Sequence, residues 1–137
     1  MRKTIGLLVL LFFIKQIVTH TVQCDDKNSL FDKKWLLIKI QGVEAPQGSS
    51  LVFEPLKVTG STGCNTFWAP IEYKRDSEID IGPPQSARLY CYRAMALERA
   101  YLAALESIKS FKLEGNKLKM MMEDGDVFLE FETASKR

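Results

Sequence analysis

The most reactive side chains in this 137-residue sequence belong to three cysteines and one histidine. Cys64 and Cys91 lie in the middle of the chain, whereas Cys24 and His20 lie near its start. Thiols can form a disulfide, bind a metal or act as nucleophiles, and an imidazole is the side chain best suited to move a proton near pH 7. The chemistry that is open therefore depends on which of these four residues the mature protein keeps.

Residues 1–24 have the pattern of a secretory signal peptide. Arg2 and Lys3 precede an apolar run at residues 5–14, and a polar stretch follows it. The run is about half as long as the ~20 residues of a transmembrane helix, so we expect no transmembrane span. If the signal peptide is cleaved after Cys24, we expect the mature protein to be secreted or held in the cell envelope. The alternative is cleavage before Cys24 with a lipid anchor on that residue, although Gln23 is larger than lipoprotein processing accepts.

Loss of this segment removes His20, and the mature chain then has no histidine. This excludes a nucleophile activated by histidine and a histidine zinc site. Lysine or carboxylate chemistry stays open, but most pairs among 17 acids on a small domain are ordinary surface pairs. We therefore expect a protein that is not an enzyme and that uses no cofactor and no metal.

The same segment carries three cations, Arg2, Lys3 and Lys15, and no acid. Subtracting these three lowers Lys plus Arg from 19 to 16 against 17 Asp plus Glu, so the net charge falls from +2 to −1. The basic pI of the whole chain thus comes from the signal peptide. Because nucleic-acid binding rests on an excess of cations, we expect no nucleic-acid partner.

Two cysteines stay after cleavage, and an even pair in an exported protein is typical of a disulfide. We expect Cys64 and Cys91 to be bonded, with two free buried thiols as the alternative. Cys64 lies in residues 58–67, where Gly60, Gly63 and Asn65 permit a sharp turn. A disulfide would fix this turn to a distant segment.

The elements around the turn follow from hydrophobic periodicity. Alternation predicts four strands within residues 35–40, 51–59, 67–74 and 78–81, before Gly82-Pro83-Pro84 ends strand structure. Spacing of three and four predicts a helix over about residues 93–108. Its buried face is expected to hold Leu97, Tyr101, Leu105 and Ile108, and its solvent face Arg93, Glu98, Arg99 and Glu106. Three strands joined by tight turns should follow, within residues 111–114, 118–122 and 127–131.

The predicted fold class is α+β: an open antiparallel, barrel-like sheet with a single helix packed on it, in the order four strands, helix, three strands. Residues 25–33 are predicted to be a flexible lead that buries little, residues 34–132 the domain, and residues 133–137 a disordered tail.

Several of these residues carry a resemblance to a known family. Trp35, Cys91 and Phe131, with the motif residues Gly60, Gly63, Cys64, Asn65, Arg88 and Glu98, resemble the META domain family, the group of the heat-shock protein HslJ. The resemblance covers residues 34–132. It implies an open antiparallel barrel with one helix, frequent export, and links with heat shock, antibiotic tolerance or virulence. For Glu98 we favour a structural role, capping backbone amides or pairing with Arg88 or Arg93.

The function hypothesis is a monomeric binding or assembly module of the cell envelope or secretory space, which contacts another protein or an apolar ligand. The candidate surface holds Phe67, Trp68, Tyr90 and Tyr92, which a disulfide would bring together; packing of these side chains as core is the alternative. A second hypothesis is a secreted peptidase inhibitor whose loop, residues 82–90, is held rigid by the disulfide.

Overall fold

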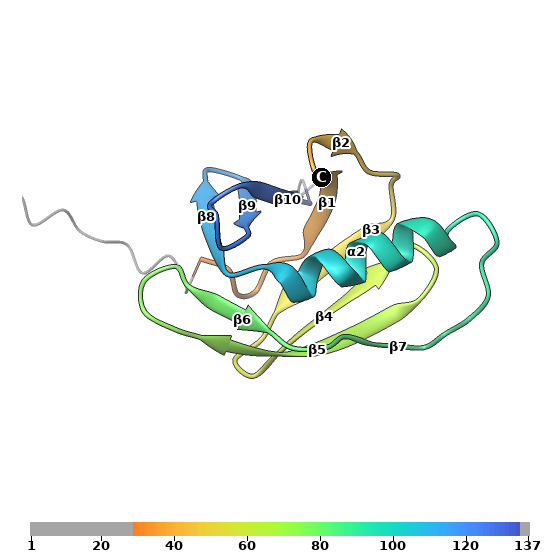
Figure 1. The fold of residues 1–137 in the computed structure, drawn as a ribbon, viewed down its shortest axis with the longest axis horizontal. Coiled ribbons are helices and arrows are strands. Elements are labelled where there is room, and N and C mark those ends of the chain that lie inside the picture. The colour runs from red at the N-terminus through yellow and green to blue at the C-terminus, as the bar shows by residue number, and fades with distance from the viewer. Residues whose placement is uncertain (1–28, 135–137) are drawn as a thin grey trace, which may run out of the picture.

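The computed structural model describes residues 29–134, which form ten strands and one helix (Figure 1). In chain order these are β1 (Trp35–Ile40), β2 (Val43–Glu44), β3 (Ser49–Phe53), β4 (Lys57–Thr62), β5 (Thr66–Tyr73), β6 (Ile79–Ile81), β7 (Gln85–Ser86), α2 (Met95–Ser107), β8 (Ser110–Glu114), β9 (Lys117–Met121) and β10 (Val127–Thr133). The predicted signal peptide, the first part of the lead and residues 135–137 of the tail lie outside the described residues.

The fold class is confirmed, but the predicted order of elements is wrong, because seven strands and not four precede the helix. Pro55 separates β3 from β4, which pair as a hairpin, where one interrupted strand was expected. The other two additions, β2 and β7, are only two residues long. Strands this short have no alternation that a sequence pattern can detect.

The strands form an antiparallel sheet in the order β6-β5-β4-β3-β1-β10-β9-β8, with β2 paired to β1 and β7 paired to β5. Its two edges meet. The Ile79 N–H donates a hydrogen bond to the Lys109 carbonyl, and the Phe111 N–H donates one to the Ser77 carbonyl, both at 3.0 Å. A hydrogen bond from the Lys109 ammonium group also holds the pKa of the Asp80 carboxyl below its ordinary value. The sheet is therefore a nearly closed barrel.

Helix α2 packs on this barrel and contacts β4, β6 and β10 (Figure 1). Its side chains Tyr101, Ala104 and Leu105 are buried, together with Ile108 directly after it. Leu97, which was expected in this face, is only partly buried, whereas the next residue, Glu98, is buried. No helix within residues 29–134 is long and apolar enough to cross a membrane.

The start of the domain lies earlier in the chain than predicted. Leu30 is fully buried, and its carbonyl oxygen accepts a hydrogen bond of 3.1 Å from the indole N–H of the buried Trp35. Phe31 forms a bridge with Phe53 of β3 and packs against the core. The expectation that residues 25–33 bury little is therefore wrong at Leu30, which was missed because it is an isolated apolar residue among polar neighbours. At the other end, Thr133 belongs to β10 and not to a tail.

Candidate functional site

The β4–β5 turn is built by Thr62 and the three residues after it. Gly63 has a φ of 89°, a left-handed conformation that glycine adopts without strain. The Thr62 N–H donates to the Asn65 carbonyl at 2.8 Å, and the Asn65 N–H donates to the Thr62 hydroxyl oxygen at 2.9 Å. These two bonds close the turn and leave the Asn65 side chain pointing away from it.

Gly60 has a different role from the one expected, since it lies inside β4 and not at the turn. A Cβ atom at this position would collide with the Ser50 carbonyl oxygen and lie 2.8 Å from the Phe67 ring. Phe67 in turn packs edge-on against Tyr101 of α2, with 5.6 Å between the ring centroids. The packing of the barrel therefore requires a residue without a Cβ atom at position 60.

Glu98 is the centre of a buried hydrogen-bond network, although it carries a carboxylate in the first turn of α2. Its Oε2 atom accepts hydrogen bonds of 2.8 Å from the Thr62 hydroxyl and from the Asn65 amide. Its Oε1 atom accepts one of 3.2 Å from the Ser86 hydroxyl of β7. Three neutral donors thus compensate the desolvation of the carboxylate.

The prediction that Glu98 faces solvent and pairs with Arg88 or Arg93 is wrong. Glu98 is only 7% exposed, and within residues 29–134 neither arginine forms an ion pair with it. A helical pattern assigns polar residues to solvent, whereas the donors that satisfy Glu98 come from β4, the β4–β5 turn and β7. The structural role favoured for Glu98 fits this network, with different partners.

The segment after β7 is fixed to the β4–β5 turn at two points. Cys64 and Cys91 form a disulfide with 6.1 Å between their Cα atoms, which confirms that prediction. The Asn65 amide donates to the Leu89 carbonyl at 3.0 Å and accepts from the Leu89 N–H at 2.9 Å. Arg88, just before this contact, has a left-handed φ of 57°. Residues 87–93, which we term the pinned loop, therefore have a defined backbone without belonging to the sheet.

The pinned loop presents large apolar side chains to solvent. Leu89 is 63% exposed, Tyr90 76% and Tyr92 83%. Phe67, predicted for the same surface, is only 4% exposed and belongs to the core, so that part of the prediction is wrong. Alternation along β5 explains the difference between Phe67 and its neighbour Trp68, which points to the outer face of the sheet and is 49% exposed.

No group of three or more His, Cys, Asp or Glu that could hold a metal ion is found in the part of the chain that the structure describes. The two thiols are joined to each other, and every buried side-chain nitrogen or oxygen within this part has a hydrogen-bond partner. Asn65 and the disulfide hold the pinned loop, and Glu98 accepts a hydrogen bond from the Asn65 amide.

Comparison with protein families shows to which family this domain belongs. The META domain family model matches residues 28–135. The chain belongs to the META domain family. The match begins before residue 34 and ends after residue 132, so this META domain includes the buried Leu30 and the whole of β10.

Solved structures share the fold of this META domain. A protein from Burkholderia xenovorans is 20% identical, with a TM-score of 0.60, and the match covers 80% of this chain and 86% of that one. A duf4847 family protein from Bacteroides vulgatus is 11% identical, with a TM-score of 0.61 and coverage of 82% and 99%. No curated protein matches the sequence. At these identities the likeness concerns the fold alone.

The network of this META domain predicts a difference between two substitutions of Glu98. Glu98→Ala removes the shared acceptor of three hydrogen bonds and should lower the free energy of unfolding by about 2 kcal/mol. Glu98→Gln keeps one carbonyl acceptor and can donate to the Ser86 oxygen, so its loss should be below about 1 kcal/mol. Urea melts followed by circular dichroism measure both.

Glu106→Ala is the matched control, because Glu106 is an exposed glutamate of the same helix. It should change the unfolding free energy by less than about 0.5 kcal/mol. If Glu98→Ala behaved like this control, Glu98 would not hold the network together.

Proposed function

We propose that this META domain is a monomeric, non-enzymatic binding or assembly module of the cell envelope or secretory space, and that the pinned loop is its contact surface. The observation that carries the proposal is the exposure of Leu89, Tyr90 and Tyr92 on a backbone held by a disulfide and by Asn65. Large exposed apolar side chains that lie together are a common mark of interaction sites.

The composition of the pinned loop supports binding to another protein. Two arginines, Arg88 and Arg93, are exposed beside the two tyrosines. Tyrosine and arginine are among the residue types most enriched where interfaces gain their affinity. The fixed backbone also lowers the conformational entropy that would be lost on association. An unidentified protein is therefore the partner that this loop fits best.

A location outside the cytosol is supported by two features. A disulfide persists in oxidising compartments such as the periplasm or the secretory space. The pattern of residues 1–24 also predicts export from the cytosol, although those residues lie outside the described part of the chain. Association with stress or virulence follows from the family resemblance alone and is part of the proposal.

The test is to compare Tyr90→Ala and Tyr92→Ala with the unchanged protein. Because both side chains are more than three-quarters exposed, each variant should keep its melting temperature within about 2 °C. Each should also lose the partner that the unchanged protein recovers from the native envelope or secretome. Stable variants that recover the same partners in the same amounts would overturn the pinned loop as the contact surface.

Peptidase inhibition is the second hypothesis, and the exposed, disulfide-fixed loop is what favours it. Part of the segment proposed for it, residues 82–90, is otherwise engaged, since Gln85 and Ser86 pair with β5 as β7. The left-handed φ of Arg88 also interrupts the extended backbone that a strand-like insertion into a cleft needs. Inhibition of a panel of serine, cysteine and metallopeptidases would decide for this hypothesis, and we expect none.

A further inference from the structure

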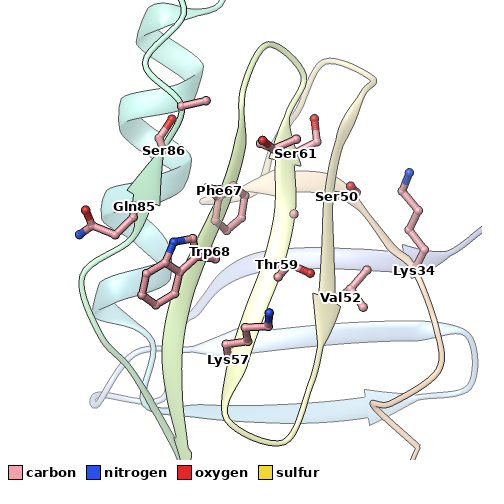
Figure 2. A pocket seen from close by; sticks show the side chains of 13 residues that line it. Lys34, Ser50, Val52, Lys57, Thr59, Ser61, Phe67, Trp68, Gln85 and Ser86 are labelled. Atoms are coloured by element: carbon pink, nitrogen blue, oxygen red, sulfur yellow. The ribbon is translucent and has the colours of Figure 1, made fainter.

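A groove lies on the outer face of β3, β4 and β5, and it reaches the pinned loop only at Ala87. It has a volume of about 780 Å³, which is within the range of small-molecule sites. Figure 2 shows Trp68 and Gln85 on one side of it and Val52 and Lys34 on the other, with Thr59 between them. Strand register explains this arrangement, because Val52 pairs with Thr59, Thr59 with Trp68, and Trp68 with Gln85.

Trp68 gives the groove a flat aromatic wall. The side chain is 49% exposed, and its indole N–H makes no hydrogen bond within residues 29–134. Trp35 contrasts with it, since that indole is fully buried and donates to Leu30. A half-exposed tryptophan with an unused donor can cover an apolar surface of a ligand and bond to its polar edge.

The remaining lining mixes small and apolar residues with polar ones, and its charged side chains are lysines. The carboxylate of Glu54 lies beside the groove and accepts a hydrogen bond of 3.3 Å from the Thr59 hydroxyl. Thr66, Ser61 and Gln85 contribute hydroxyl and amide groups, and Lys34 and Lys57 contribute ammonium groups, while no Asp or Glu among residues 29–134 lines the groove. The Lys34 ammonium group forms no ion pair within the described residues. Lys57 lies 3.6 Å from a Glu54 oxygen, but both side chains are at least 40% exposed, so this pair is weak.

These features select among ligand classes. A purely apolar ligand would leave the hydroxyl, amide and ammonium groups without partners. A pyranose ring presents a face of C–H groups, which can stack on an indole, and a rim of hydroxyls, which can bond to Thr66, Ser61 and Gln85. A carboxylate or sulfate on the ring would complement Lys34 and Lys57. The geometry points to a binding site for an acidic oligosaccharide, with one sugar stacked on Trp68.

This site goes beyond the proposed function and does not depend on it. The lining of the groove includes neither Leu89, Tyr90 nor Tyr92. A protein partner on the pinned loop and a saccharide in the groove thus use different side chains, although the two surfaces adjoin at Ala87. Tyr92→Ala should abolish the first and leave the second unchanged, so that either proposal can fail alone.

The experiment is calorimetric titration of the full chain, with its disulfide intact, against two matched pairs of trisaccharides. The acidic members are β-(1→4)-linked trimannuronate and α-(1→4)-linked trigalacturonate, and the neutral members are mannotriose and galactotriose of the same linkages. We expect at least one acidic trisaccharide to bind about tenfold or more tighter than its neutral counterpart, since only the acidic member can pair with the lysines.

Two substitutions distinguish the contribution of aromatic stacking to binding from that of charge. Trp68→Ala should weaken binding of the acidic trisaccharide about thirtyfold or more, as for the loss of a central aromatic anchor. Lys34→Gln should weaken it about threefold to tenfold and leave the neutral counterpart unaffected. Tyr92→Ala, at an exposed aromatic outside the groove, and Lys112→Gln, at an exposed lysine of β8, are the controls and should change nothing.

Nuclear magnetic resonance of the unchanged protein provides a second measurement that needs no variant. Addition of the acidic trisaccharide should shift the indole N–H signal of Trp68 and the backbone signal of Thr59, and leave the indole signal of the buried Trp35 in place. Absence of binding by both acidic trisaccharides would overturn the proposal. So would binding that Trp68→Ala leaves intact, or a loss with Lys112→Gln equal to that with Lys34→Gln, which would indicate charge attraction without a site.

Discussion

Replacing Cys64 or Cys91 with serine is expected to lower the free energy of unfolding by about 3.5 kcal/mol. The disulfide closes a loop with a sequence separation of 27 residues, and in the chain-entropy account a cross-link of this span removes about that much freedom from the unfolded chain. Guanidinium melts of the oxidised protein and of each variant measure the loss. The same loss should appear in the unchanged protein after reduction.

The double variant is the control for this prediction. Because both single changes remove the same bond, Cys64→Ser with Cys91→Ser should cost little more than either change alone. Losses that add in the double variant would contradict a shared bond. The pinned loop should remain partly ordered in all three variants, because the Asn65 side chain still holds Leu89.

Leu105→Ala is expected to destabilise the protein by about 2 to 5 kcal/mol, the range for removal of a fully buried leucine side chain that leaves a cavity. Leu105 lies on the face of α2 that packs on the barrel. Leu56→Ala makes the same chemical change at a leucine that is 82% exposed and should cost less than about 0.5 kcal/mol. Urea melts of the two variants measure the difference. A loss for Leu105→Ala as small as that for Leu56→Ala would show that the buried face of the helix is assigned wrongly.

Much of the fold could be predicted because its signals are local. The spacing of Tyr101, Leu105 and Ile108 placed the helix, and the alternation of Phe67 and Trp68 marked a strand with one buried face. The disulfide followed from an even pair of cysteines and an export pattern. The predicted number of strands was too low because some strands have no pattern of their own in the sequence. Gln85 and Ser86, for example, form a strand only because β5 lies beside them.

The parts of the site that could not be predicted depend on contacts between distant residues. Nothing near Glu98 in the sequence indicates that Thr62, Asn65 and Ser86 will surround it, so a solvent position was the reasonable expectation. Gly60 had a visible signal, a glycine inside a β pattern, which often marks the close approach of another group. That signal could have indicated the contact with Phe67.

The central claim, that this META domain works by binding through the pinned loop, is tested most directly by photo-cross-linking in the native host. A photoreactive phenylalanine derivative in place of Tyr92 should form an adduct with a specific protein. Excess unchanged protein should suppress that adduct, and excess Tyr90→Ala, Tyr92→Ala double variant should not. The same derivative in place of Leu56, which is equally exposed but lies outside the loop, should form none. Equal adducts at both positions, or none at position 92, would contradict the claim.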